Sequence, residues 1–206
     1  MTFEFSKLKT GDLILFNYKA KGCFGCFTKC IKWGTHSNYS HIGMILRDPT
    51  YINPNLKGLF VWESSWEGHP DPQDGKYKLG VQITPLYELL DEYKKNNSNV
   101  YVRKIECDKN LFSDENLNKV HEVVKDKPYD IVPLDWIEAL FQKDLSPQKT
   151  SRFWCSALVG YIYTKCGLLE PESDWSIMRP NDFSLSGENL KFKENVKLSD
   201  SILKLL

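Results

Sequence analysis

The order of the apolar patterns along the chain constrains the fold more than any other feature. Short apolar or alternating runs, typical of strands, fill most of the first half, and helical spacing dominates the second half. The runs lie at residues 13–16, 42–46, 60–62, 81–83 and 100–105. The predicted helices are one opened by Pro85 and three over residues 113–124, 135–141 and 151–166. This segregation predicts an α+β fold, and a chain of 206 residues suits a single domain over residues 1–206.

Turn and helix-end residues support these boundaries. Gly11-Asp12 predicts a turn before the first strand, and Gly167 is placed to end the last long helix. Pro180–Phe183 predicts a short helical turn. The apolar residues among 202–206 are expected to pack back on the body of the domain.

One cysteine stands near the start of a predicted helix. Thr150 and Ser151 are N-cap candidates, so Cys155 is expected in or near the first helical turn. Backbone N–H groups and the helix dipole there favour a thiolate and could hold an oxyanion during acyl transfer. Cys155 is therefore a candidate nucleophile. It also shares a helix face with Leu158 and Ile162, so a second interpretation is that it is a small apolar core residue.

A histidine base for this thiol is predicted at the start of a strand. His41 begins the apolar run Ile42–Leu46, and Gly43, the next residue on its face, leaves space beside the imidazole. A surface or capping histidine is the alternative. His36, His69 and His121 are rival bases, and the latter two lack a small neighbour that makes room.

Glu63 is the candidate for the group that orients the base. It ends the strand after that of His41 and lies on a face where an apolar residue is expected. If the two strands are antiparallel neighbours, the start of one lies near the end of the other. A solvated carboxylate at a strand end is the alternative to this catalytic role.

The four motifs in this order resemble a known family. They are Gly11-Asp12-Leu13-Ile14, Tyr39-Ser40-His41-Ile42-Gly43, Pro128-Tyr129-Asp130 and Trp154-Cys155-Ser156-Ala157-Leu158-Val159. The chain resembles the circularly permuted papain-like amidases of the NlpC-type superfamily, which include YiiX- and YaeF-like proteins and a poxvirus group. In that branch the histidine precedes the cysteine, as His41 precedes Cys155 here.

The resemblance covers roughly residues 8–185 and implies a permuted papain-like fold. Such a fold has a small antiparallel sheet or barrel packed against helices. By resemblance, Cys155 is the nucleophile, His41 the base and Glu63 the orienting acid of a thiol hydrolase, with no cofactor. The substrate would be a peptide, an N-acyl compound or a lipid. A lipid acyltransferase or phospholipase, related to lecithin:retinol acyltransferase, and a non-catalytic binding or virion module are the alternatives.

Three further cysteines have no place in this pattern. Cys23, Cys26 and Cys30 would share one helix face, and only His36 is close enough in sequence to complete a zinc site. Plain packing is the favoured interpretation, with no metal. Zinc binding, and lipidated or membrane-contacting cysteines, are alternatives.

Composition restricts the location and partners. The formal net charge of zero gives no reason to expect a nucleic-acid partner. The N-terminus lacks a signal-peptide pattern and no apolar run is long enough for a transmembrane segment, so a cytoplasmic or other reducing compartment is expected. Peripheral membrane contact stays open. The richness in Lys and Asn suits an AT-rich genome such as that of a large DNA virus, for which virion association is an alternative.

Overall fold

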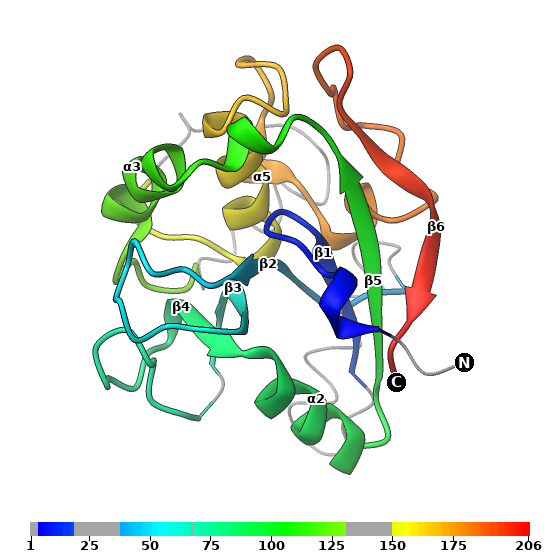
Figure 1. Cartoon of the computed structure of the whole chain (residues 1–206). Helices are drawn as coiled ribbons and strands as arrows, with labels where there is room; N and C mark the ends of the chain where they lie inside the picture. Colours follow the sequence, from blue (N-terminus) through cyan, green and yellow to red (C-terminus); the bar gives the residue numbers. More distant parts are fainter. Residues whose placement is uncertain (1–3, 19–37, 67, 131–149) are drawn as a thin grey trace.

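The protein folds around a single antiparallel sheet (Figure 1). The computed structural model describes residues 4–18, 38–66, 68–130 and 150–206. The strands are β1 (Leu13–Asn17), β2 (His41–Arg47), β3 (Leu59–Ser65), β4 (Gly80–Pro85), β5 (Asn99–Glu106) and β6 (Lys197–Lys204). They lie in the order β4-β3-β2-β1-β5-β6, and every neighbouring pair is antiparallel. The predicted α+β class and the five predicted strands are confirmed.

Helices form where the chain carries start and stop residues. They are α2 (Leu86–Lys95), α3 (Asp114–Val124) and α5 (Cys155–Lys165), with 3₁₀ turns η1 (Phe5–Lys7), η2 (Lys109–Phe112), η3 (Trp175–Ile177) and η4 (Pro180–Phe183). Pro85 precedes α2, and the Ser113 side chain accepts a hydrogen bond from the Asn116 N–H at the start of α3. Gly167, at φ 82°, follows α5 in the left-handed conformation that ends many helices.

Apolar side chains on the two faces of the sheet form two separate cores. Alternate residues of β2 point to opposite faces. Ile42 and Met44 pack with α3 and α5, whereas Ile45 packs with α2. The helices α3 and α5 therefore cover one face of the sheet and α2 covers the other (Figure 1).

Two boundaries differ from the sequence prediction. Helix α5 begins at Cys155 rather than at residue 151, because Phe153 forms backbone hydrogen bonds with Pro128 and Asp130 instead of entering the helix. Strand β6 was expected only as a packed terminal segment. Its side chains are mostly exposed, so it has little apolar pattern, and the backbone of β5 defines it.

Two other predictions lie outside the described residues. The helix expected over 135–141 and the cysteines at 23, 26 and 30 belong to segments that the structure does not describe. Of the helices it does describe, none has the length and apolar character needed to cross a membrane.

Candidate active site

His41 and Glu63, both predicted as site residues, are brought into direct contact. His41 Nε2 lies 2.6 Å from Glu63 Oε2, a distance typical of a short, charge-assisted hydrogen bond. The His41 side chain is 12% exposed and that of Glu63 is fully buried. The ring of His41 also packs on Phe16 of β1, with ring centroids 5.2 Å apart. The imidazole is thus held between an aromatic ring and a carboxyl group.

The register of β2 and β3 explains this contact. Met44 is opposite Trp62, so by continuation of the register Gly43 faces Glu63 and His41 lies diagonally across from it. Diagonal neighbours are within reach of long side chains. Because Gly43 has no side chain, the imidazole can cross the space opposite Glu63. A Cβ on Gly43 would lie 2.4 Å from Val61 Cγ1 and 3.3 Å from Glu63 Cβ.

The environment of Glu63 favours its protonated form. Complete burial raises the pKa of the Glu63 carboxyl to about 8, although the hydrogen bond from Thr84 opposes the shift. Thr84 Oγ1 donates to Glu63 Oε1 at 2.7 Å, so both carboxyl oxygens have partners. The pair can therefore hold one proton between Oε2 and Nε2 near neutral pH. His41 Nδ1 is the ring nitrogen that faces away from Glu63.

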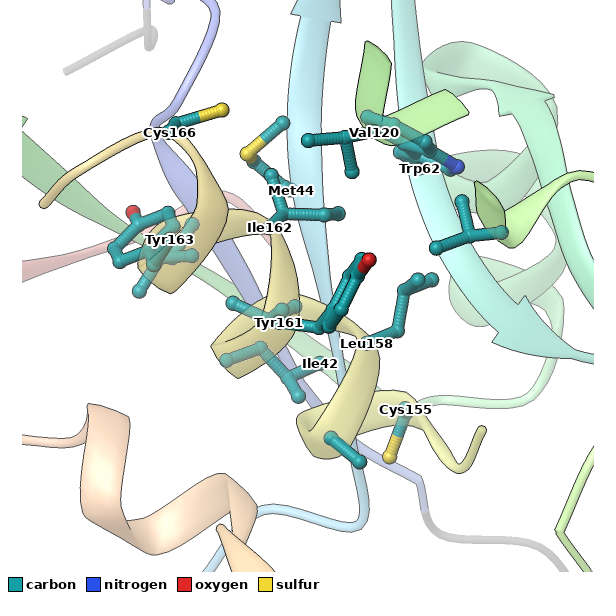
Figure 2. Packing of buried hydrophobic residues seen from close by; sticks show 14 of the residues in the cluster. Ile42, Met44, Trp62, Val120, Cys155, Leu158, Tyr161, Ile162, Tyr163 and Cys166 are labelled. Atoms are coloured by element: carbon teal, nitrogen blue, oxygen red, sulfur yellow. The ribbon is translucent and has the colours of Figure 1, made fainter. Parts of the chain in front are cut away.

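Cys155 is the first residue of α5 and is buried. Figure 2 shows it at the end of the helix nearer to Ile42, while Cys166 lies at the end nearer to Met44. Ile42 follows His41 in β2 and belongs to the same apolar cluster as Cys155. The helix and the strand thus begin at the same end of the sheet. His41, however, alternates with Ile42 and packs on Phe16 of the α2 core, so the register directs its imidazole to the face of the sheet opposite Cys155.

Several hydrogen bonds fix the start of α5. Trp154 Nε1 and Ser156 Oγ, on either side of Cys155, donate to the carbonyl oxygen of Met178 at 3.1 and 2.7 Å. Ser64 Oγ of β3 donates to the Phe153 carbonyl at 2.7 Å. Position 155 is consequently held from both sides, and the backbone N–H groups of a first helical turn are available to an anion there.

Tyr129 is a neighbour of the thiol. Its segment lies beside Phe153 in a parallel bridge. Burial raises the pKa of the Tyr129 phenol well above its usual value, and negative charge on Cys155 raises it further. The phenol is therefore a neutral hydroxyl in the electrostatic range of the sulfur.

Sequence reasoning missed Thr84 as a contact of the site. Gln82 and Thr84 alternate with the buried Val81 and Ile83 of β4, which places both polar residues on one face. That alternation was the available signal. Ser64 carried no signal beyond its place next to Glu63, and Tyr129 none beyond its place in the Pro128-Tyr129-Asp130 motif.

The rival bases occupy other places. His121 is buried in α3 and its Nε2 lies 2.8 Å from Gln73 Oε1. His69 is exposed, and His36 lies outside the described residues. Cys107, Cys155 and Cys166 are free thiols. Among the residues that the structure describes, no group of three or more His, Cys, Asp or Glu side chains could hold a metal ion.

The sequence was also compared with known proteins: no protein-family model and no curated protein matches it.

Proposed function

We propose that the protein is a thiol hydrolase that cleaves an amide or ester bond through an acyl-Cys155 intermediate. The observation that carries the proposal is the buried His41–Glu63 pair; Cys155 begins α5 at the same end of the sheet, on its other face. A carboxyl group that orients a histidine and a cysteine at a helix start are two parts of a cysteine-nucleophile site; the third part is contact between thiol and imidazole.

The reaction would use each residue in turn. Cys155 Sγ attacks the carbonyl carbon while its proton passes to His41 Nδ1. In the state with the shared proton on Nε2, Glu63 is a carboxylate that accepts this hydrogen bond, orients the ring and stabilises the imidazolium. The C–N or C–O bond then breaks and His41 returns the proton to the leaving group. Water attacks the thioester with His41 as base, which releases the acid and restores the thiol.

The backbone N–H groups at the start of α5 would stabilise the oxyanion of the tetrahedral intermediate. If the acyl group passes instead to an alcohol or amine of a lipid, the same site is an acyltransferase. Whether the protein is a hydrolase or an acyltransferase depends on whether water or a lipid group accepts the acyl group, and analysis of the reaction products distinguishes the two.

The test is to trap Cys155. The protein is treated with a panel of peptidyl, N-acyl and lipid-like thiol probes carrying vinyl sulfone or β-lactone groups, and each cysteine is followed by mass spectrometry. Cys155 is expected to react most rapidly, and His41→Asn to slow it strongly. Burial raises the pKa of Cys166 to about 12 and also raises that of Cys107, so these thiols are internal controls. Equal labelling of all cysteines, or a rate that His41→Asn leaves unchanged, would contradict the proposal.

A further inference from the structure

The loop between β3 and β4 is organised around the buried ammonium group of Lys78. The Lys78 side chain is 9% exposed, and its Nζ lies 2.9 Å from Asp71, 3.0 Å from Asp74 and 2.7 Å from Asp126. Two of these carboxylates belong to the loop itself. Asp126 lies just after α3, so Lys78 joins the loop to the end of that helix.

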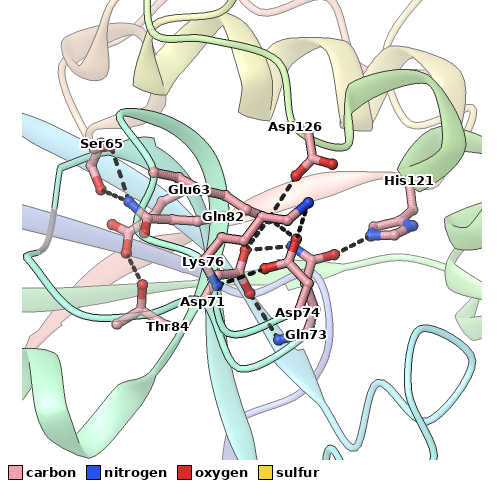
Figure 3. A network of polar contacts seen from close by, with 11 residues as sticks. Glu63, Ser65, Asp71, Gln73, Asp74, Lys76, Gln82, Thr84, His121 and Asp126 are labelled. Carbon is pink, nitrogen blue, oxygen red and sulfur yellow. Dashed lines mark hydrogen bonds and ion pairs between the residues drawn. The ribbon is translucent and has the colours of Figure 1, made fainter.

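A second connection runs from the same loop to α3. Asp71 also accepts a hydrogen bond from the Gln73 amide, and Gln73 Oε1 meets His121 Nε2 at 2.8 Å. The loop is therefore attached to α3 at His121 and again at Asp126. In Figure 3 these side chains form one continuous polar network.

Asp126 has a left-handed backbone conformation. Its φ is 58°, in a region that aspartate tolerates better than most residues other than glycine. Residues in this conformation persist where their surroundings hold them. The ion pair with Lys78 holds the Asp126 side chain while the chain turns out of α3 into residues 127–130.

The residues after Asp126 pair with the start of β4. Val81 N–H donates to the Lys127 carbonyl at 2.9 Å, and Tyr129 N–H donates to the Leu79 carbonyl at 3.0 Å. The backbones approach so closely that a Cβ on Gly80 would lie 2.2 Å from the Lys127 oxygen. Because the pairing is antiparallel, Lys78 lies beyond one end of this short ladder and Asp126 beyond the other, and their ion pair spans it.

The same segment holds the residues before the nucleophile. Phe153 N–H donates to the Pro128 carbonyl and Asp130 N–H donates to the Phe153 carbonyl, both at 3.1 Å. Phe153 is two residues before Cys155. A continuous series of backbone hydrogen bonds thus links the Lys78–Asp126 ion pair to the start of α5.

We propose that Lys78 is a positioning residue for Cys155: by fixing residues 126–130 through Asp126, it sets the position of the helix start that carries the thiol. The inference rests on the proposed role of Cys155 as nucleophile. Small displacements of a reacting group are costly for the rate. Lys78 would therefore control the reactivity of a residue that it does not touch.

The test follows the alkylation of Cys155 by iodoacetamide between pH 5 and 9, with each cysteine quantified by mass spectrometry. Lys78→Met is expected to slow Cys155 by about tenfold near pH 7 and to shift its pH profile upward. Lys78→Arg, which keeps the charge, should restore much of the rate. Lys76→Met is the matched control. The Lys76 side chain is 67% exposed, and its Nζ is 3.7 Å from Asp74, so this ion pair is weak. Lys76→Met should behave as wild type.

Lys78→Met also leaves three carboxylates without their cation and could prevent folding. Asp126→Asn then tests the inference, since it weakens the ion pair between Lys78 and residue 126 and leaves Lys78 paired with Asp71 and Asp74. A folded Asp126→Asn or Lys78→Met protein with the wild-type profile of Cys155 would overturn the inference. If wild-type Cys155 reacts no faster than an unfolded cysteine, the proposed function fails instead, and the comparison between variants still shows whether Lys78 controls the helix start.

Discussion

His41 and Glu63 are 22 residues apart in the sequence and 2.6 Å apart at their nearest side-chain atoms. The contact depends on an antiparallel β2–β3 pair and on a glycine at position 43 that leaves the crossing path open. Thr84, from a third strand, holds the other carboxyl oxygen. Three neighbouring strands therefore build one buried acid–imidazole pair, and the first two predictions concern the residues of this pair.

The first prediction concerns Glu63→Gln, which keeps the size of the side chain and removes its ionisation. We expect the labelling rate and turnover to fall by about tenfold to a hundredfold, because the His41 imidazolium loses a stabilising partner. Cys155→Ala should abolish both. Since burial places the pKa of Glu63 at about 8, the wild-type rate profile should change slope near pH 8 and that of the variant should not. Wild-type kinetics in Glu63→Gln would make Glu63 a structural residue.

The second prediction concerns the distance between the proposed nucleophile and base. In crystals of the substrate-free protein we expect Cys155 Sγ within about 4 Å of His41 Nδ1, which allows for a loose hydrogen bond. β2 and α5 begin at the same end of the sheet (Figure 2), but His41 and Cys155 belong to opposite faces of it, so this distance is the decisive measurement. A separation beyond about 8 Å, with both side chains in a rigid core, would reject the enzymatic proposal.

The sheet was predictable where burial imposed an apolar pattern. Strands β1 to β5 carry buried residues that reveal them in the sequence, whereas β6 is mostly exposed and is defined by backbone pairing with β5. The same reasoning applies to α5. Thr150 and Ser151 have the right chemistry for an N-cap, but long-range hydrogen bonds from Pro128 and Asp130 keep Phe153 extended. Local propensity cannot reveal such a partner.

The candidate site was predictable in part for similar reasons. The proximity of His41 and Glu63 followed from strand order and from a charged residue on a buried face. The network around Lys78 could not be read in the same way. A loop rich in Asp, Pro and Gly predicts solvent exposure, and only the folded chain shows that Lys78 and the Asp71 carboxylate are buried together.

The third prediction concerns Gly43→Ala. Its added methyl would lie 2.4 Å from Val61 Cγ1, so β2 and β3 must separate or Val61 must move. We expect a loss of unfolding free energy of about 1–3 kcal/mol, measured by urea denaturation. Val61→Ala makes room at that position, so in a double-mutant cycle it should offset part of the cost. Additive losses would show that the strain lies elsewhere.

The last prediction concerns His121 and acid stability. Burial, followed by the positive charge of Lys125, lowers the pKa of His121 below its usual value of 6.5. The groups around it include Glu122 on the same helix, 3.8 Å from Nδ1, and Asp71 and Lys78 of the β3–β4 loop. As the pH falls below 6.5, the unfolded chain binds a proton at this histidine more readily than the folded chain does. Folding stability must therefore decrease on acidification.

His121→Gln tests this linkage, because a glutamine amide can still donate to Gln73 but does not titrate. Between pH 7 and 5, the wild type should lose more unfolding free energy than the variant in urea titrations followed by tryptophan fluorescence. Other groups, Glu63 among them, titrate in both proteins, so their effects cancel in the difference. His69→Gln, at an exposed histidine, is the matched control and should follow the wild-type curve. If the curves of wild type and His121→Gln run parallel over this range, His121 does not couple protonation to folding.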